Sequence, residues 1–145
     1  MANSVQYAKT VDTPSVKLDT TELHGRVRVA YADFTSASAQ ETINMFKLPN
    51  GARIIGGRLN HAALGSSTTL SVGHAAYVNA AGTTVAADVD EYKAAAASTS
   101  VSAADIARTT ALGENSVVDA PDGLIVTATT AGANATGLIT VQMTY

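Results

Sequence analysis

Short segments of this chain alternate between apolar and polar residues, and turn residues separate one segment from the next. In the last of these segments, residues 137–145, the apolar residues Ile139, Val141 and Met143 occupy every second position. A period of two places alternate side chains on opposite faces of an extended strand, whereas a helix repeats about every 3.6 residues. The alternation therefore predicts a fold built from antiparallel strands, with the chain ending inside a sheet.

Other segments with the same character are expected to form further strands. They are residues 25–31, 41–48, 53–59, 68–78 and 123–129. In the first, Val27, Val29 and Tyr31 are expected to share one face of a half-buried strand. In the second, Ile43 is expected on the opposite face from Leu48. Many short strands with hardly any helix indicate an all-β, antiparallel sandwich that is jelly-roll-like.

One short helix is expected at about residues 89–97, where four alanines follow a charged cluster. Asp88 can cap the start of such a helix, and Glu91 three residues later completes the pattern of a capping box. The same acidic cluster lacks the twelve-residue loop with a central glycine that binds calcium. A capped helix start therefore explains these acids without a metal ion.

The segment FKLPNGARIIGG, residues 46–57, combines a predicted turn with a predicted bend. Pro49, Asn50 and Gly51 suit the second, third and fourth positions of a tight turn between two strands. Gly56 and Gly57 are adjacent glycines in a strand, which indicate a bend or a close backbone approach at a sandwich corner. The spacing of Gly51 and Gly56 resembles a phosphate-binding loop, but the lysine and hydroxyl residue of that loop are missing. A structural role is predicted.

The first 24 residues lack a sustained periodicity and contain Pro14, which favours an extended N-terminal arm. Residues 25–145 are expected to form one β-sandwich domain. Apolar residues in the arm are spaced as anchors that contact the domain or a neighbouring subunit. These are Val5, Tyr7, Val11, Val16 and Leu18.

Charged residues make up 14% of the chain, compared with about 25% in an average soluble domain. Either the surface is rich in threonine and serine, or copies of the chain or a partner cover part of it. The net charge of −3 disfavours nucleic-acid binding, which usually requires a basic surface. No apolar run is long enough to cross a membrane or to act as a signal peptide.

No arrangement of residues indicates catalysis or metal binding. The three histidines occur singly, and the chain has no cysteine, so neither a zinc motif nor a disulfide is expected. The nucleophile motifs of hydrolases are also absent. We therefore predict no enzyme activity, no cofactor and no metal. The histidines are His24, His61 and His74.

Several segments together resemble a known family. They are residues 6–11 (QYAKTV), 24–31 (HGRVRVAY), 43–54 (INMFKLPNGARI), 69–73 (TLSVG) and 137–145 (GLITVQMTY). In combination these segments look like small virion structural proteins of tailed bacteriophages, the head decoration or cement proteins. The resemblance implies a jelly-roll-like fold and a homo-oligomer, with a trimer expected.

The resemblance also implies a location and a partner. The chain would be made in the host cytoplasm and would attach to the capsid surface of the virion, with the major capsid protein as its partner. It would have no catalytic role, no nucleic-acid partner and no membrane partner. The arm residues Val5, Tyr7, Val11, Val16 and Leu18 would then contact the capsid shell or a neighbouring subunit.

A second hypothesis is a tail- or fibre-associated β module that binds cell-surface glycans. Sugar binding favours exposed aromatic rings beside polar groups, and Tyr77 and Tyr92 are the candidates near predicted loops. Tail and neck proteins reuse the same β architectures, so fold alone does not separate the two hypotheses.

Overall fold

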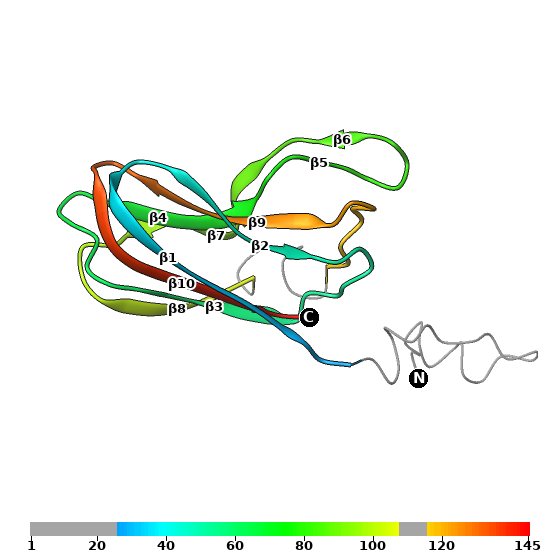
Figure 1. Cartoon of the computed structure of the whole chain (residues 1–145), viewed down its shortest axis with the longest axis horizontal. Coiled ribbons are helices and arrows are strands. Elements are labelled where there is room, and N and C mark those ends of the chain that lie inside the picture. Colours follow the sequence, from blue (N-terminus) through cyan, green and yellow to red (C-terminus); the bar gives the residue numbers. More distant parts are fainter. Residues whose placement is uncertain (1–25, 108–115) are drawn as a thin grey trace, which may run out of the picture.

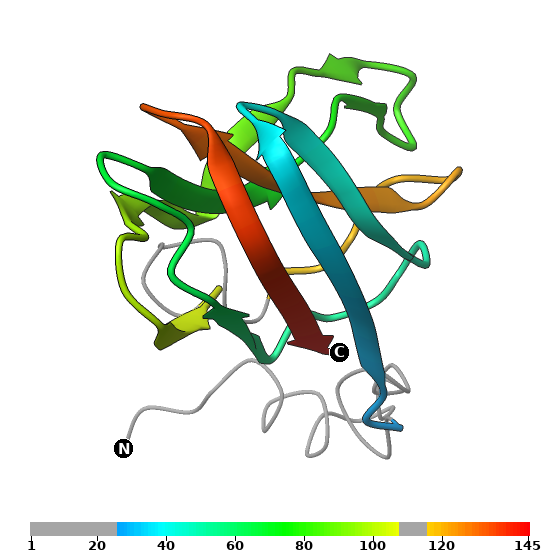
Figure 2. The same cartoon turned by 60° about the vertical axis from the view of Figure 1, so that its left-hand side comes forward.

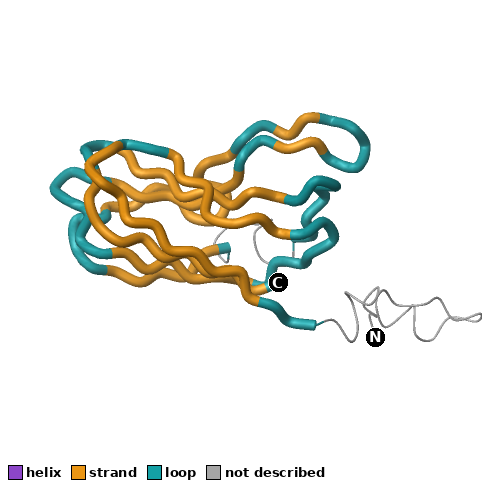
Figure 3. The backbone as a smooth tube through the Cα atoms, viewed as in Figure 1, coloured by secondary structure: helices purple, strands orange, loops and turns teal. Residues whose placement is uncertain are grey.

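The computed structural model describes residues 26–107 and 116–145, and the regular structure in these ranges consists of strands only (Figures 1 and 3). No helix within these ranges could cross a membrane. The strands are β1 (Val29–Ala39), β2 (Thr42–Leu48), β3 (Gly56–His61), β4 (Thr69–His74), β5 (Tyr77–Val78), β6 (Thr84–Val85), β7 (Asp88–Ala97), β8 (Ser102–Ile106), β9 (Leu124–Ala131) and β10 (Ala135–Thr144).

Two four-stranded antiparallel sheets pack against each other (Figure 2). Sheet A has the strand order β1-β10-β3-β8, and sheet B has the order β2-β9-β4-β7. The chain changes sheet at every connection except that between β4 and β7, where the β5–β6 hairpin is inserted and extends away from the sheets (Figure 1). This order is that of an eight-stranded jelly roll. The predicted antiparallel jelly-roll-like sandwich is confirmed.

The last strand, β10, lies inside sheet A. It pairs with β1 on one side and with β3 on the other, so that Val141 lies between Ala32 and Leu59. The alternating residues Ile139, Val141 and Met143 are fully buried, as their period predicts. Beyond the end of β10, the backbone N–H groups of Arg28 and Tyr145 each donate to the other residue's carbonyl, at 2.7 and 2.9 Å. The C-terminal strand is therefore held on both sides.

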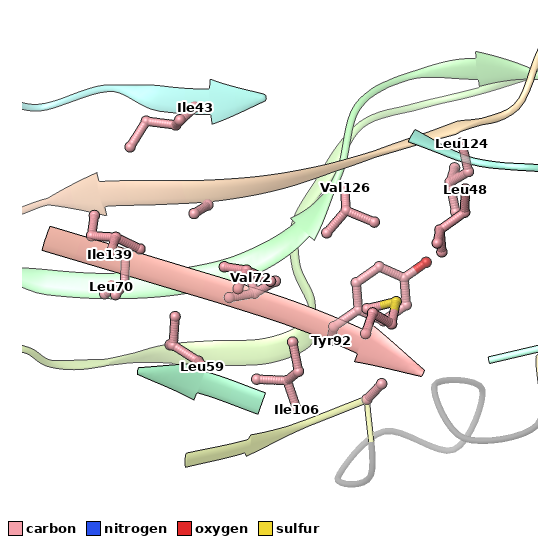
Figure 4. Packing of buried hydrophobic residues seen from close by; sticks show 14 of the residues in the cluster. Ile43, Leu48, Leu59, Leu70, Val72, Tyr92, Ile106, Leu124, Val126 and Ile139 are labelled. Atoms are coloured by element: carbon pink, nitrogen blue, oxygen red, sulfur yellow. The ribbon is translucent and has the colours of Figure 1, made fainter. Parts of the chain in front are cut away.

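Aliphatic side chains fill the space between the sheets (Figure 4). Of the phenylalanines and tyrosines in the described ranges, only Tyr92 is buried. Full burial of a valine, leucine or isoleucine side chain stabilises a fold by about 1.5–3 kcal/mol relative to exposure. The core thus depends on many medium-sized contributions. Its fully buried members include Leu48, Ile54, Leu59, Leu64, Leu70, Val72, Ile106, Val126 and Ile139.

In β2 the predicted facing of side chains is wrong, because the strand contains a bulge. Asn44 pairs with Thr127 of β9 and Phe46 pairs with the next residue, Val126, so Met45 is an extra residue. A bulge shifts the alternation by one position. Ile43 and Leu48 are therefore both buried.

In β1 the predicted burial of the apolar face is also wrong. The register with β10 places Val29 opposite Thr144 and Tyr31 opposite Gln142, on the face that points away from sheet B. Val27, Val29 and Tyr31 are 68, 61 and 58% exposed. The side chains of β1 that point inward include those of Ala30 and Phe34, which pack against the core.

The predicted helix at residues 89–97 is wrong, because this segment belongs to strand β7. β7 pairs with β4, and a wide bulge separates the pair His74–Asp88 from the pair Val72–Lys93. The Asp88 carboxylate accepts a hydrogen bond from the backbone N–H of Asp90 at 3.1 Å, within this bulge. Asp88, which was expected to cap a helix, closes a local turn instead. Aspartate side chains accept hydrogen bonds from nearby backbone N–H groups outside helices too. Pairing with β4 overrides the helix propensity of the alanines.

Candidate assembly surface

The connection that contains Pro49, Asn50 and Gly51 leads from β2 in sheet B to β3 in sheet A. The backbone N–H of Ala52 donates to the carbonyl of Pro49 at 3.2 Å, so the turn lies one residue later than predicted. Gly51 is its third residue, with a φ of +76° that other residues adopt only at a cost. The side-chain carbonyl of Asn50 accepts the N–H of Ala120 at 3.1 Å. The bond from Ala120 attaches the turn to the segment before β9.

Gly56 and Gly57 are the first two residues of β3. A Cβ atom on Gly57 would lie 2.5 Å from the carbonyl oxygen of Gln142 in β10 and 2.9 Å from Cγ1 of Ile106 in β8. Gly57 therefore allows the close approach of three strands of sheet A. Both glycines contribute to packing in this region, since Gly56 is buried and pairs with Thr144.

The two histidines of the described ranges lie in different sheets, His61 in β3 and His74 in β4. Each ring donates from Nδ1 to the carbonyl of the next residue, at 2.8 Å for Ala62 and 2.9 Å for Ala75. Across residues 26–107 and 116–145, no three His, Asp or Glu side chains come together in a way that could hold a metal ion. His24 lies outside the described residues.

The arm residues Val5, Tyr7, Val11, Val16 and Leu18 also lie outside the described residues, so their predicted contacts remain predictions. The described chain begins at Arg26, immediately before the exposed apolar residues of β1.

These exposed residues, Val27, Val29 and Tyr31, define what we call the β1 edge surface. β1 is one of the two outermost strands of sheet A, with β10 as its hydrogen-bonded neighbour in that sheet. An outermost strand presents backbone groups that can pair with another chain, and exposed apolar side chains on it favour contact with a protein surface. The alternation of these residues in the sequence predicts an apolar face, but it does not show that this face is exposed. The β1 edge surface is therefore the best candidate for assembly in the described domain.

Asp33 lies on the same outward face of β1 as Val29 and Tyr31. The hydroxyl groups of Thr140 and Tyr31 both donate hydrogen bonds to its carboxylate. These bonds, that from Thr140 first, hold the pKa of Asp33 below its usual range, because they stabilise the charged form. The bond to Asp33 in turn raises the pKa of Tyr31. β1 and β10 are therefore joined by side chains as well as by backbone pairing.

The two tyrosines considered for glycan binding are placed differently from each other. Tyr77 is half-buried, whereas Tyr92 is 4% exposed and belongs to the core. The His74 ring contacts both, with its centroid 5.5 Å from that of Tyr77 and 6.3 Å from that of Tyr92. Burial raises the pKa of the Tyr92 hydroxyl, which stays neutral. Tyr92 is thus unavailable for stacking on a sugar ring.

The fold is similar to chains in solved structures of two phage particles. One is in a structure described as the capsid asymmetric unit of cyanophage Pam1, with a TM-score of 0.60, 24% identity, and coverage of 83% of this chain and 84% of that chain. The other is in the capsid of Ralstonia phage GP4, with a TM-score of 0.62, 20% identity and the same coverage of both chains. No protein-family model matches the sequence, and no curated protein matches it. At these identities, the similarity shows that the chain shares its jelly-roll fold with these two capsid chains.

Proposed function

We propose that this chain is a structural protein of a tailed-phage virion and that it decorates or cements the capsid. The observation that carries the proposal is the jelly roll, which matches chains from two phage capsids over 83% of this chain and 84% of each of theirs. The exposed apolar residues of the β1 edge surface also support it, because an isolated domain gains nothing from leaving them in water. No catalytic role follows from this function.

The partner in this proposal is the major capsid protein, and the assembly is a homotrimer on the outer surface of the capsid. The arm, residues 1–24, precedes β1 directly, so the arm and the β1 edge surface form neighbouring stretches of one chain. We assign the arm to contact with the capsid shell or an adjacent subunit. Val5, Tyr7, Val11, Val16 and Leu18 supply its apolar contacts.

Attachment to capsids tests this proposal. Purified full-length protein is mixed with capsids that lack it, and the bound fraction is measured by sedimentation. We expect the full-length chain to sediment with the capsids and a variant without residues 1–20 to remain in the supernatant. The thermal unfolding midpoint of the truncated protein should stay close to that of the full-length chain, since strand β1 begins at Val29.

Two results separate the parts of the proposal. Undiminished attachment of the truncated protein would contradict the role of the arm but leave the capsid role intact. Failure of the full-length chain to bind capsids, with a solution mass equal to that of a monomer, would contradict the capsid role itself.

A further inference from the structure

A cavity of about 630 Å³ opens beneath the β5–β6 hairpin, between the start of β7 and the segment before β9. Apolar residues contribute to its walls, among them Ile54, Val85 and Val118. No lysine or arginine is found among the described residues that line it, and its carboxylates are those of Asp88 and Glu91. The cavity therefore combines apolar walls with two carboxylates, and His74 in the same lining is the titratable group whose charge interacts favourably with Asp88.

The two carboxylates are held in different ways. The backbone N–H of Asp90 donates to Asp88, and this bond chiefly holds the pKa of Asp88 below its usual range. Asp88 is accordingly ionised at neutral pH. Glu91 is half-buried in the wide bulge of β7, three residues along the chain. When they are ionised, both carboxylates accept hydrogen bonds and donate none.

Two nearly buried polar side chains also line the cavity. His74 is 8% exposed, and its Nδ1 donates to the carbonyl of Ala75. Tyr92 is 4% exposed and borders the cavity. The ring of Tyr77 forms part of the same lining.

We propose that this cavity binds the cationic end of an arginine or lysine side chain that another protein chain presents. Guanidinium and ammonium groups are donors without acceptors, which complements the carboxylates of Asp88 and Glu91 in the lining. Aromatic rings attract such cations, and apolar walls suit the alkyl stem that carries them. The assignment does not depend on the capsid role, because it rests on the chemistry of the cavity alone.

The test uses nuclear magnetic resonance of the full-length protein, titrated with N-acetyl-arginine amide and with N-acetyl-lysine amide. N-acetyl-citrulline amide is the matched control, since it has the shape of the arginine probe without its charge. We expect saturable shifts of the backbone signals of His74, Tyr77 and Glu91 with both cationic probes. Binding of citrulline should be about tenfold weaker or more, because a charge-assisted hydrogen bond is lost.

Two variants then assign the charge. Asp88→Asn keeps a side-chain oxygen that can accept the N–H of Asp90, and Glu91→Gln keeps the shape of the side chain. If one of these variants fails to fold, the other alone tests the role of the negative charge. Each should weaken arginine binding about tenfold. Asp122→Asn, an exposed acid outside this lining, should leave it unchanged. Equal binding of citrulline, shifts centred elsewhere, an absence of saturable shifts, or unchanged affinity in the folded variants would each overturn the proposal.

Discussion

Gly51 and Gly57 are required for different physical reasons, although only six positions separate the turn at Gly51 from Gly57 in β3. At Gly51 the constraint is the backbone angle, since a Cβ atom there would meet nothing within 4 Å. At Gly57 the constraint is space, because a Cβ atom would collide with a backbone oxygen of β10. The sequence indicates that both positions are special, but only the packing of β3 between β8 and β10 separates the two causes.

This difference predicts the outcome of two alanine variants. Gly51→Ala should cost about 1 kcal/mol of unfolding free energy, the usual penalty for a left-handed residue. Gly57→Ala should cost more, about 2–3 kcal/mol, because strands must separate to accommodate the methyl group. Chemical denaturation of both variants measures the difference. Equal losses of unfolding free energy in the two variants would contradict the conclusion that Gly57 is needed for the close approach of β3 to β10.

Asp33 predicts a pH dependence at the residue scale. Its folded-state pKa lies below the ordinary value of 3.8, so its contribution to stability is fully present above that value. The contribution is lost as the pH falls through the lower folded-state pKa. The stability difference between wild type and Asp33→Asn should therefore shrink as the pH drops from about 5 towards 2.

Denaturation curves across this pH range provide the measurement. Thr140→Val, which removes the first of the two donors, is the matched variant and should show part of the same effect. A difference between wild type and Asp33→Asn that is constant over the whole range would contradict the assignment.

At the scale of single elements, the strand pattern could be read from the sequence more reliably than the facing of each strand. The alternation in β10 predicts its buried residues because the strand is regular. In β2 the extra residue Met45 shifts the alternation, and no local signal in the sequence marks it. In β7 the Asp88 and Glu91 spacing is compatible with a helix cap and with a turn in a bulge, and pairing with β4 decides. In both strands, the facing of the side chains depends on the register with a strand that is distant in the sequence, and local sequence does not contain that register.

The β1 edge surface gives a prediction for one element. The double variant Val29→Ser and Tyr31→Ser should reduce self-association and capsid binding while changing the unfolding free energy by only about 0.5 kcal/mol, since both side chains are exposed. Val101→Ser is the control, because Val101 is 79% exposed but lies beside β8 rather than β1. Light scattering should give three times 14.7 kDa for wild type and control, and less for the double variant. A double variant with the mass and capsid affinity of the control would exclude this surface.

At the scale of the whole molecule, the jelly roll could be predicted from many short alternating segments and the scarcity of helical ones. The candidate site could be predicted only in part. The turn and bend residues Pro49, Asn50, Gly51, Gly56 and Gly57 all fall at the crossing between the sheets and the start of β3. The cavity under the β5–β6 hairpin could not be foreseen, because it joins His74, Asp88 and Val118 from separate parts of the chain. Such a juxtaposition exists only once β4 and β7 have paired and the segment before β9 lies beside them.

The mutual hydrogen bonds of Arg28 and Tyr145 bring the two ends of the folded domain together. A few added residues could therefore link position 145 to position 26 and make the domain a closed ring. Such a ring could be opened again in the exposed turn at residues 80–82, at the tip of the β5–β6 hairpin. The rearranged protein should keep the pairing of both sheets, because no strand would be cut. A chain that begins in this hairpin would then carry the jelly roll without its arm, and would show what the domain does alone.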